Sequence, residues 1–167
     1  MIFVARLAHI LAGAFWFGTF MFVARFLMPA VKAAGPGAGP LMAQLGKRIP
    51  QAMMGAAAVT ILSGFWLMSL VSGGSVGTFM QSGFGRTIGL GAASAILAIT
   101  LGMIINVPAS RRMAAVNEGI GKRGGAPTAT EAAELQKIMA RLGMGTMVAG
   151  TFLFIAVVAM AVARYVP

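Results

Sequence analysis

Residues Phe3–Met28 read FVARLAHILAGAFWFGTFMFVARFLM, an apolar run whose only ionisable side chains are Arg6, His9 and Arg25. A helix that crosses the hydrocarbon core of a bilayer, about 30 Å thick, needs about 20 apolar residues at roughly 1.5 Å each. Arg6 and Arg25 lie 19 residues apart, which is about 28 Å of helix. Long cationic side chains at this spacing can reach water at both membrane surfaces. The run therefore predicts a transmembrane helix that is retained and not cleaved as a signal peptide.

Three further apolar runs predict spans at about residues 49–73, 87–108 and 142–165. Arginines flank the last two of these runs: Arg86 and Arg111, Arg141 and Arg164. The whole chain of 167 residues is 59% hydrophobic and 10% charged, whereas soluble domains carry about 25% charged residues. The composition and the runs together predict an all-α integral membrane four-helix bundle, with residues 1–167 forming a single transmembrane domain.

The basic residues predict the orientation of the four spans. The first and third loops, with their flanking turns, hold ten of the thirteen lysines and arginines. Because cytoplasmic loops of membrane proteins are enriched in basic residues, these two loops are expected in the cytoplasm. Both termini then face the external, periplasmic side, as does the glycine-rich second loop GGSVGTFMQSGFG. This topology predicts a multi-pass membrane protein that contacts anionic lipid headgroups.

The third loop, residues 109–141, is the longest cytoplasmic connection. Pro108 is expected to end or kink the third span, and residues 109–120 are compatible with an amphipathic helix. Residues 121–127 (GKRGGAP) read as a flexible linker. Thr128 and Glu131 then have the spacing of a capping box, which predicts a new helix that leads into the fourth span. The sequence shows no convincing internal repeat and no second domain.

Small residues predict how the helices pack. Lipid is as apolar as leucine, so helices in a membrane associate through close contact between small side chains. Three pairs in the spans have the small-xxx-small spacing: Thr60 and Gly64, Ala98 and Gly102, Thr146 and Gly150. These faces are expected to pack within a compact bundle or against a neighbouring subunit.

The absence of certain residue types narrows the function. The three acidic residues, Glu118, Glu131 and Glu134, all lie in the cytoplasmic connection, and the chain has no cysteine. Proton-coupled transporters usually need a carboxylate or a chain of histidines inside the membrane, so this class is disfavoured. Basic residues at the ends of apolar runs also argue against a nucleic-acid partner. The sequence offers no basis for a catalytic mechanism, which leaves an enzymatic role open but disfavoured.

His9 is the only histidine, and it lies one turn inside Arg6 on the same helix face. It can be an axial ligand of a haem or another tetrapyrrole, or a metal ligand. It can equally be an interfacial histidine that hydrogen-bonds a neighbouring helix. Because no second histidine exists, one copy of the chain cannot ligate a haem through two histidines.

Trp16 lies at a depth that is unusual for tryptophan. It follows Arg6 by ten residues, which is about 15 Å of helix and near the bilayer midplane, whereas tryptophan prefers the membrane surfaces. His9, Gly13, Trp16 and Phe20 follow helical spacing and form one stripe. We expect this stripe to face protein, either as ordinary packing or as the lining of a ligand site.

The 14 methionines raise the alternative of copper ligation, because thioethers suit Cu(I). They are scattered through the spans, however, and methionine is also a common packing residue. No metal site is predicted.

The run Arg6-Leu-Ala-His9-Ile-Leu-Ala-Gly-Ala-Phe-Trp16-Phe-Gly18 has the form H-x6-W-x-G and is followed by F-x-x-R-F. Together with Thr60-Ile-Leu-Ser-Gly64-Phe-Trp-Leu67, it resembles the first two helices of a group of small four-helix bacterial membrane proteins. The group comprises the copper-resistance protein D family, a related family of uncharacterised integral membrane proteins and the membrane protoporphyrinogen IX oxidases.

The resemblance implies the fold, a location in the bacterial inner membrane and a tetrapyrrole-binding ancestry for the first helix. In the oxidases, a histidine of the first helix and a lysine at the start of the third are the expected functional pair. His9 matches the histidine, and Arg86 stands in the region of the lysine. The resemblance therefore implies His9, Trp16 and Arg86 as candidate residues for binding a cofactor.

Two functional hypotheses follow from the sequence. The first is an accessory or structural membrane subunit of a larger respiratory or photosynthetic electron-transfer complex, which packs through glycine-rich helix faces. The second is a membrane protein related to haem, another tetrapyrrole or copper that uses His9 and Trp16. The expected partners are membrane lipid and other membrane-protein subunits.

Overall fold

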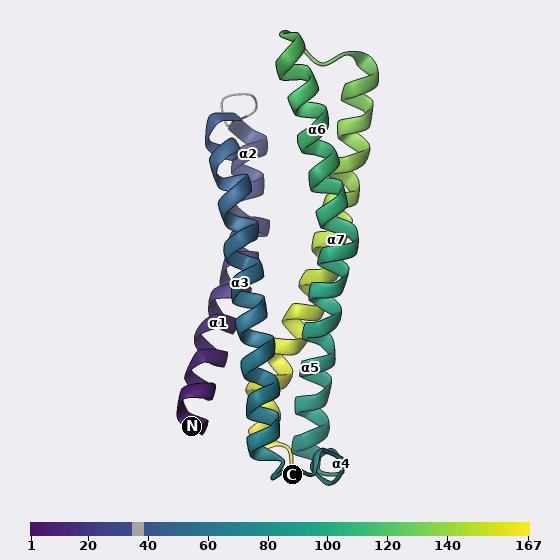
Figure 1. Cartoon of the computed structure of the whole chain (residues 1–167). Helices are drawn as coiled ribbons and strands as arrows, with labels where there is room; N and C mark the ends of the chain where they lie inside the picture. The colour runs from purple at the N-terminus through teal and green to yellow at the C-terminus, as the bar shows by residue number, and fades with distance from the viewer. Residues whose placement is uncertain (35–38) are drawn as a thin grey trace. The chain divides into compact units, whose positions relative to one another are not determined.

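The computed structural model describes the backbone of residues 1–34 and 39–167, and the side chains of residues 1–34, 44–46 and 48–167. Every long element in the described part is a helix, and this part contains no strand (Figure 1). Four helical segments in it are long and apolar enough to cross a membrane. The prediction of an all-α protein with four long apolar helices is therefore confirmed.

Turns and short segments connect the long helices. In chain order the elements are α1 (Ile2–Phe22), η1 (Val23–Leu27), α2 (Met28–Ala34), α3 (Gly39–Val71), α4 (Val76–Phe79), α5 (Gly83–Leu101), η3 (Gly102–Asn106), α6 (Val107–Arg123), α7 (Ala129–Val162) and η4 (Ala163–Tyr165). The segments η1 and η3 are π-helices that continue the α-helices on both sides of them.

The helices extend beyond the predicted apolar runs, and mainly toward the basic loops. The first continues to Ala34, the second begins at Gly39, the third continues to Arg123 and the fourth begins at Ala129. Hydropathy marks the residues suited to lipid, whereas capping and local ion pairs decide where a helix ends. For this reason the apolar runs underestimate the lengths of the helices.

The two π-helices precede prolines in the same register. The segment η1 ends two residues before Pro29, and η3 ends two residues before Pro108. In each case the residue before the proline donates its N–H to the carbonyl five residues earlier, Met28 to Val23 and Val107 to Gly102. A proline ring clashes with the carbonyl four residues before it, and a π-turn relieves this clash without ending the helix.

Pro108 therefore does not end the third long apolar helix, because the helix continues through η3 into α6. The segment η1 with Pro29 and the segment η3 with Pro108 thus repeat one backbone geometry. Their sequences, VARFLMPA and GMIINVPA, have only the final proline and alanine in common. Each of the two π-helices is followed by a further α-helix, of seven residues in α2 and 17 residues in α6.

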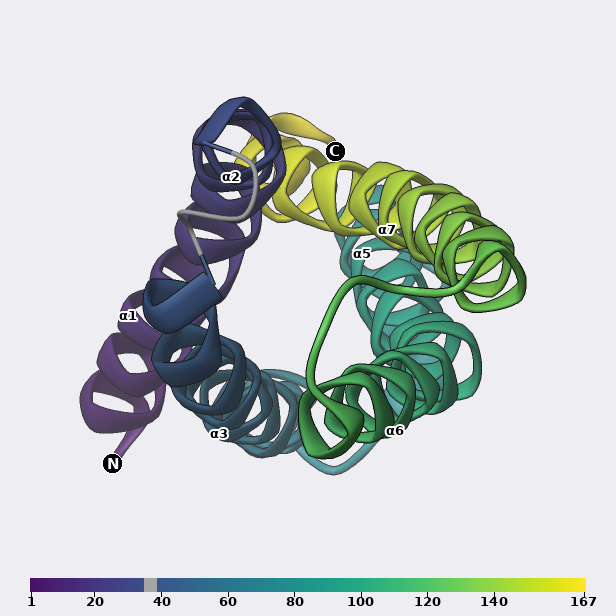
Figure 2. The same ribbon diagram turned by 90° about the horizontal axis from the view of Figure 1, so that it is seen from above.

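The chain divides into two compact units, residues 1–95 with 153–167, and residues 96–152. In the first unit, α1 packs along α3, and Figure 2 shows the two helices side by side. Gly91 of α5 lies against the last turns of α7, where an added Cβ would be 3.3 Å from the Ala156 carbonyl oxygen and 3.0 Å from Met160 Cε. Phe17 of α1 also contacts Phe154, with ring centroids 6.5 Å apart.

The second unit contains a hairpin in which α6 runs antiparallel to the first half of α7 (Figure 1). Arg112 pairs with Glu134 at 2.6 Å and Arg123 pairs with Glu131 at 2.7 Å. The predicted capping box is confirmed, because the Thr128 N–H donates to Glu131 at 2.8 Å and the Glu131 N–H donates to Thr128 Oγ1 at 3.3 Å.

The predicted linker over residues 121–127 is too long at its start, because α6 continues to Arg123. The ion pair between Lys122 and Glu118, at 2.7 Å, supports this last turn. Gly124 and Gly125 then have φ values of 69° and 115°. Side chains rarely adopt such backbone conformations, so the two glycines end the helix.

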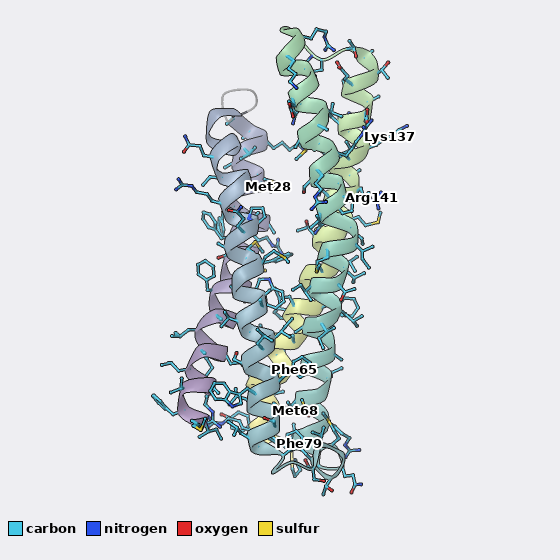
Figure 3. All side chains as sticks on the ribbon, viewed as in Figure 1. Met28, Phe65, Met68, Phe79, Lys137 and Arg141 are labelled. Carbon is cyan, nitrogen blue, oxygen red and sulfur yellow. The ribbon has the colours of Figure 1, made fainter. Side chains whose placement is uncertain are left out.

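Small residues occupy the interior of the described part. Of its eleven buried apolar residues, eight are alanines, and the others are Trp16, Ile138 and Leu153. Many large apolar side chains are exposed instead, and Figure 3 shows them projecting from the helices. This distribution agrees with the expectation that the helices approach one another through small residues.

Candidate functional site

The contact between His9 and α3 is the main polar feature on the apolar part of α1. His9 lies two turns into α1, and its Nδ1 is 2.8 Å from the carbonyl oxygen of Thr60. Thr60 itself is buried, with 8% of its surface exposed. The only histidine of the chain thus bonds the backbone of the neighbouring helix, as one of the two interpretations of its sequence position predicts.

The hydrogen bond to Thr60 determines the tautomer of His9. A carbonyl oxygen can only accept, so Nδ1 must carry the proton that it donates. In the neutral imidazole, Nε2 then keeps a lone pair. Protein metal sites use the same arrangement, in which one ring nitrogen donates to a carbonyl and the other binds the metal. His9 therefore offers Nε2 as its ligating nitrogen.

Glycine at position 64 allows the imidazole to approach α3. A Cβ at this position would lie 2.9 Å from His9 Cε1 and 3.2 Å from His9 Nδ1, closer than side chains normally tolerate. On the opposite helix, a Cβ at Gly13 would be 3.5 Å from Thr60 Cγ2, an ordinary contact. The small-xxx-small pair of Thr60 and Gly64 therefore lies at the contact with α1.

The hydroxyl groups near His9 are largely satisfied by their own helix. Thr60 Oγ1 donates to the Ala56 carbonyl at 2.8 Å, and Ser63 Oγ lies 2.5 Å from the Val59 carbonyl. Ser63 Oγ is also 3.5 Å from His9 Nδ1. Since serine and threonine in membrane helices commonly bond the carbonyl one turn back, these hydroxyls remain stable in an apolar setting.

The sequence interpretation missed Ser63 as a neighbour of His9. Ser63 follows Thr60 by three residues, which places both side chains on one face of the helix. This spacing was the sequence signal that could have grouped Ser63 with Thr60. A sequence pattern does not reveal which helix that face meets. The contact with α1 depends on the packing of α1 along α3.

Trp16 is buried, with 6% of its surface exposed. The expectation that it faces protein rather than lipid is therefore met. Along the predicted stripe, His9 and Gly13 contact Thr60 and Gly64 of α3. These contacts fit the packing interpretation of the stripe, and a ligand beside Trp16 stays a prediction.

Among the described residues, Arg86 makes no hydrogen bond to His9. It occupies the first turn of α5 and is exposed. Within the described residues, the hydrogen-bonding partners of His9 are Thr60 and Ser63. The structure brings His9 together with α3, and a joint role of His9, Trp16 and Arg86 in binding a cofactor stays a prediction.

His9 can ligate a group through Nε2 while Nδ1 donates its hydrogen bond to Thr60. Among the residues that the structure describes, no three His, Cys, Asp or Glu side chains gather where they could hold a metal ion. The three glutamates lie in α6 and the first turns of α7, where each pairs with a basic residue. The site therefore offers one imidazole nitrogen within an otherwise apolar and hydroxyl-lined surface.

Comparison with known proteins does not assign the chain to a family. No protein-family model, curated protein or solved structure matches it significantly.

Proposed function

We propose that this chain is a multi-pass protein of the bacterial inner membrane that serves as an accessory subunit of a larger respiratory or photosynthetic electron-transfer complex. The observation that carries this proposal is the distribution of side chains on the long helices, with small residues inside and large apolar residues outside. Such helices need an apolar environment, which lipid and the helices of other subunits supply.

The exposed apolar side chains cover every long helix. Examples are Leu11 of α1 with 61% of its surface exposed, Leu62 of α3 with 69%, Leu90 of α5 with 57% and Met147 of α7 with 71%. A soluble protein rarely exposes large contiguous apolar patches. Membrane insertion with the termini outside and the basic loops in the cytoplasm accounts for these surfaces and for the distribution of charge.

A second candidate function is binding of a tetrapyrrole such as haem by His9. The specific observation that favours it is the hydrogen bond from Nδ1 to the Thr60 carbonyl, which leaves Nε2 as the ligating atom. Trp16, two turns further along α1, would lie on the same face as the bound group. Electron-transfer complexes hold such cofactors, so the two candidate functions are compatible.

Purification from native membranes distinguishes these functions. A subunit is expected to migrate with a large complex in mild detergent, and a tetrapyrrole protein is expected to show a Soret absorption band. Replacement His9→Ala should abolish the band, whereas Gly55→Ala should preserve it, because the space at Gly55 is open. A colourless protein that migrates alone as a monomer would contradict both proposals.

A further inference from the structure

We propose that Arg112, Lys137 and Arg141, here called the basic flank, bind the phosphate group of an anionic phospholipid headgroup. All three residues belong to the hairpin of α6 and α7 within one compact unit. The inference rests on the proposed insertion of the chain in a membrane. It adds a specific lipid site to that proposal.

The ion pairs of the hairpin leave its positive charge unevenly distributed. All three glutamates of the chain are paired: Glu118 with Lys122, Glu131 with Arg123, and Glu134 with Arg112. Within the described chain, no acidic partner is recorded for Lys137 or Arg141. Arg112, Glu134, Lys137 and Arg141 together therefore carry two surplus positive charges.

The helical geometry places Lys137 and Arg141 close together. They are four residues apart on α7, so they project about 40° from each other around the helix, one turn apart. Figure 3 labels both on the same stretch of α7, and both are exposed. Ile138 is buried, with 8% of its surface exposed, and projects about 60° from Arg141 and about 100° from Lys137. Both cations therefore lie on one side of the helix surface that faces the interior of the unit.

The antiparallel register places Arg112 beside them. Arg112 reaches Glu134 at one end of this stretch, and Gly145 lies against Asn106 at the other. Lys137 and Arg141 lie between these two contacts on α7, about 4.5 and 10.5 Å along the α7 axis from Glu134. Lys137 follows Glu134 by three residues, and Arg141 follows Lys137 by four. At this helical spacing, all three side chains lie on one side of α7. The guanidinium held by Glu134 is thus on the same side as the two cations.

The basic flank also lies at the depth of the lipid phosphates. Arg141 directly precedes the fourth apolar run, and Lys137 lies one turn farther from the hydrocarbon. The paired residues Lys122 and Arg123 lie at the far end of the hairpin. Positive charge that is not neutralised is therefore concentrated where anionic headgroups lie. Arginine also suits phosphate through its several donors.

The same phosphate chemistry exists in soluble anions, and a binding experiment separates the two sources. Purified full-length protein in neutral detergent would be titrated with phosphatidylglycerol, phosphatidylcholine and inorganic phosphate, and bound lipid would be counted by native mass spectrometry. We expect saturable binding of phosphatidylglycerol. The double variant Lys137→Gln/Arg141→Gln should weaken it about 25-fold, the effect expected for the loss of two charges near an anionic surface.

The matched control removes two charges from the far end of the same hairpin. Lys122 and Arg123 end α6 there and pair with Glu118 and Glu131. The variant Lys122→Gln/Arg123→Gln should keep phosphatidylglycerol binding within about twofold, which is a small free-energy change. Equal weakening in both double variants would overturn the proposed site.

Two further outcomes would overturn the assignment to lipid. Phosphatidylcholine that binds as tightly as phosphatidylglycerol would exclude charge recognition. Inorganic phosphate that saturates the same residues, with no preference for the lipid, would assign the site to a soluble anion. Alkaline carbonate extraction of native membranes tests insertion separately. Protein that stays in the membrane but binds no phosphatidylglycerol would refute this site alone, whereas release by carbonate would refute the proposed insertion.

Discussion

Gly64 is the residue on which the close approach of His9 to α3 depends. Its missing side chain leaves the space that the imidazole edge occupies, since a Cβ would lie 2.9 Å from Cε1. The neighbouring Thr60 carbonyl then accepts the proton of Nδ1. A single glycine therefore sets both the packing of the ring and the tautomer that leaves Nε2 with its lone pair.

Gly64→Ala should destabilise the protein by about 1–3 kcal/mol, the usual cost of forcing an extra methyl group into a close contact. Unfolding in mixed detergent micelles measures this change. Gly55→Ala on the same helix is the control, because nothing lies within 4 Å of its added Cβ. Equal stability of the two variants would show that His9 does not pack on Gly64.

Gly145 makes the corresponding close contact in the second unit. An added Cβ would clash with Asn106 Oδ1 and lie 2.6 Å from Ile105 Cγ2. Asn106 Oδ1 is buried without a hydrogen-bond partner among the described residues. Gly145→Ala should therefore lower stability by about 1–3 kcal/mol, whereas Gly143→Ala should be tolerated, since its surroundings are open. The same micelle unfolding assay would reveal an error if the two variants behaved alike.

Glu131 makes the hairpin connection sensitive to acid. The Arg123 guanidinium, followed by the Thr128 N–H, lowers the pKa of Glu131 from 4.5 to about 2. Because the folded-state pKa is depressed, the stabilisation is complete above pH 4.5 and is lost as the pH falls toward 2. An NMR titration of ¹³C-labelled glutamate carboxyl groups measures this pKa. Arg123→Gln should raise it toward the ordinary value, and an unchanged pKa would exclude Arg123 as the main cause.

At the scale of elements, proline decides the shape of two helices without ending them. Pro29 and Pro108 each follow a π-helix by two residues. The extra residue of the π-turn moves the carbonyl that the proline ring would otherwise strike. The chain can therefore extend beyond the apolar runs in continuous helical segments, through α2 in one case and α6 in the other.

Pro108→Ala tests this role in η3. Without the proline ring, η3 can become α-helical. Removing the one extra residue that the π-turn accommodates rotates the following helix by about 100°. Arg112 would then turn away from Glu134, which it contacts at 2.6 Å. The chain has no cysteine, so a cysteine pair at positions 112 and 134 can be cross-linked cleanly. We expect Pro108→Ala to reduce cross-linking strongly, and unchanged cross-linking would exclude the rotation.

At the scale of the whole molecule, the basic loops predict one orientation. Ten of the thirteen lysines and arginines lie in or beside the first and third loops. Single cysteines at Ser75 in the second loop and at Ala126 in the third should therefore differ in labelling by an impermeant thiol reagent. Intact cells should be labelled at position 75 and protected at 126. The reverse pattern would show that the termini lie in the cytoplasm.

Local patterns were sufficient to predict several features from the sequence. The apolar runs predicted four long helices, and the spacing of Thr128 and Glu131 predicted the capping box. The small-xxx-small spacing of Thr60 and Gly64 predicted a close helix contact, and the depth of Trp16 predicted a buried ring. Each prediction used the spacing of residues along one helix, which the sequence displays directly, and none of them named the helix that makes the contact.

By itself, the sequence determined the helical class, the apolar segments and their charged ends, because solvent preference and backbone hydrogen bonding act locally. Only the tertiary structure decided that His9 meets Thr60 and that Ser63 lies beside it. It also decided which basic residues of the hairpin are paired with glutamates. These contacts join residues of different helices, and they depend on which helical faces meet and in what register.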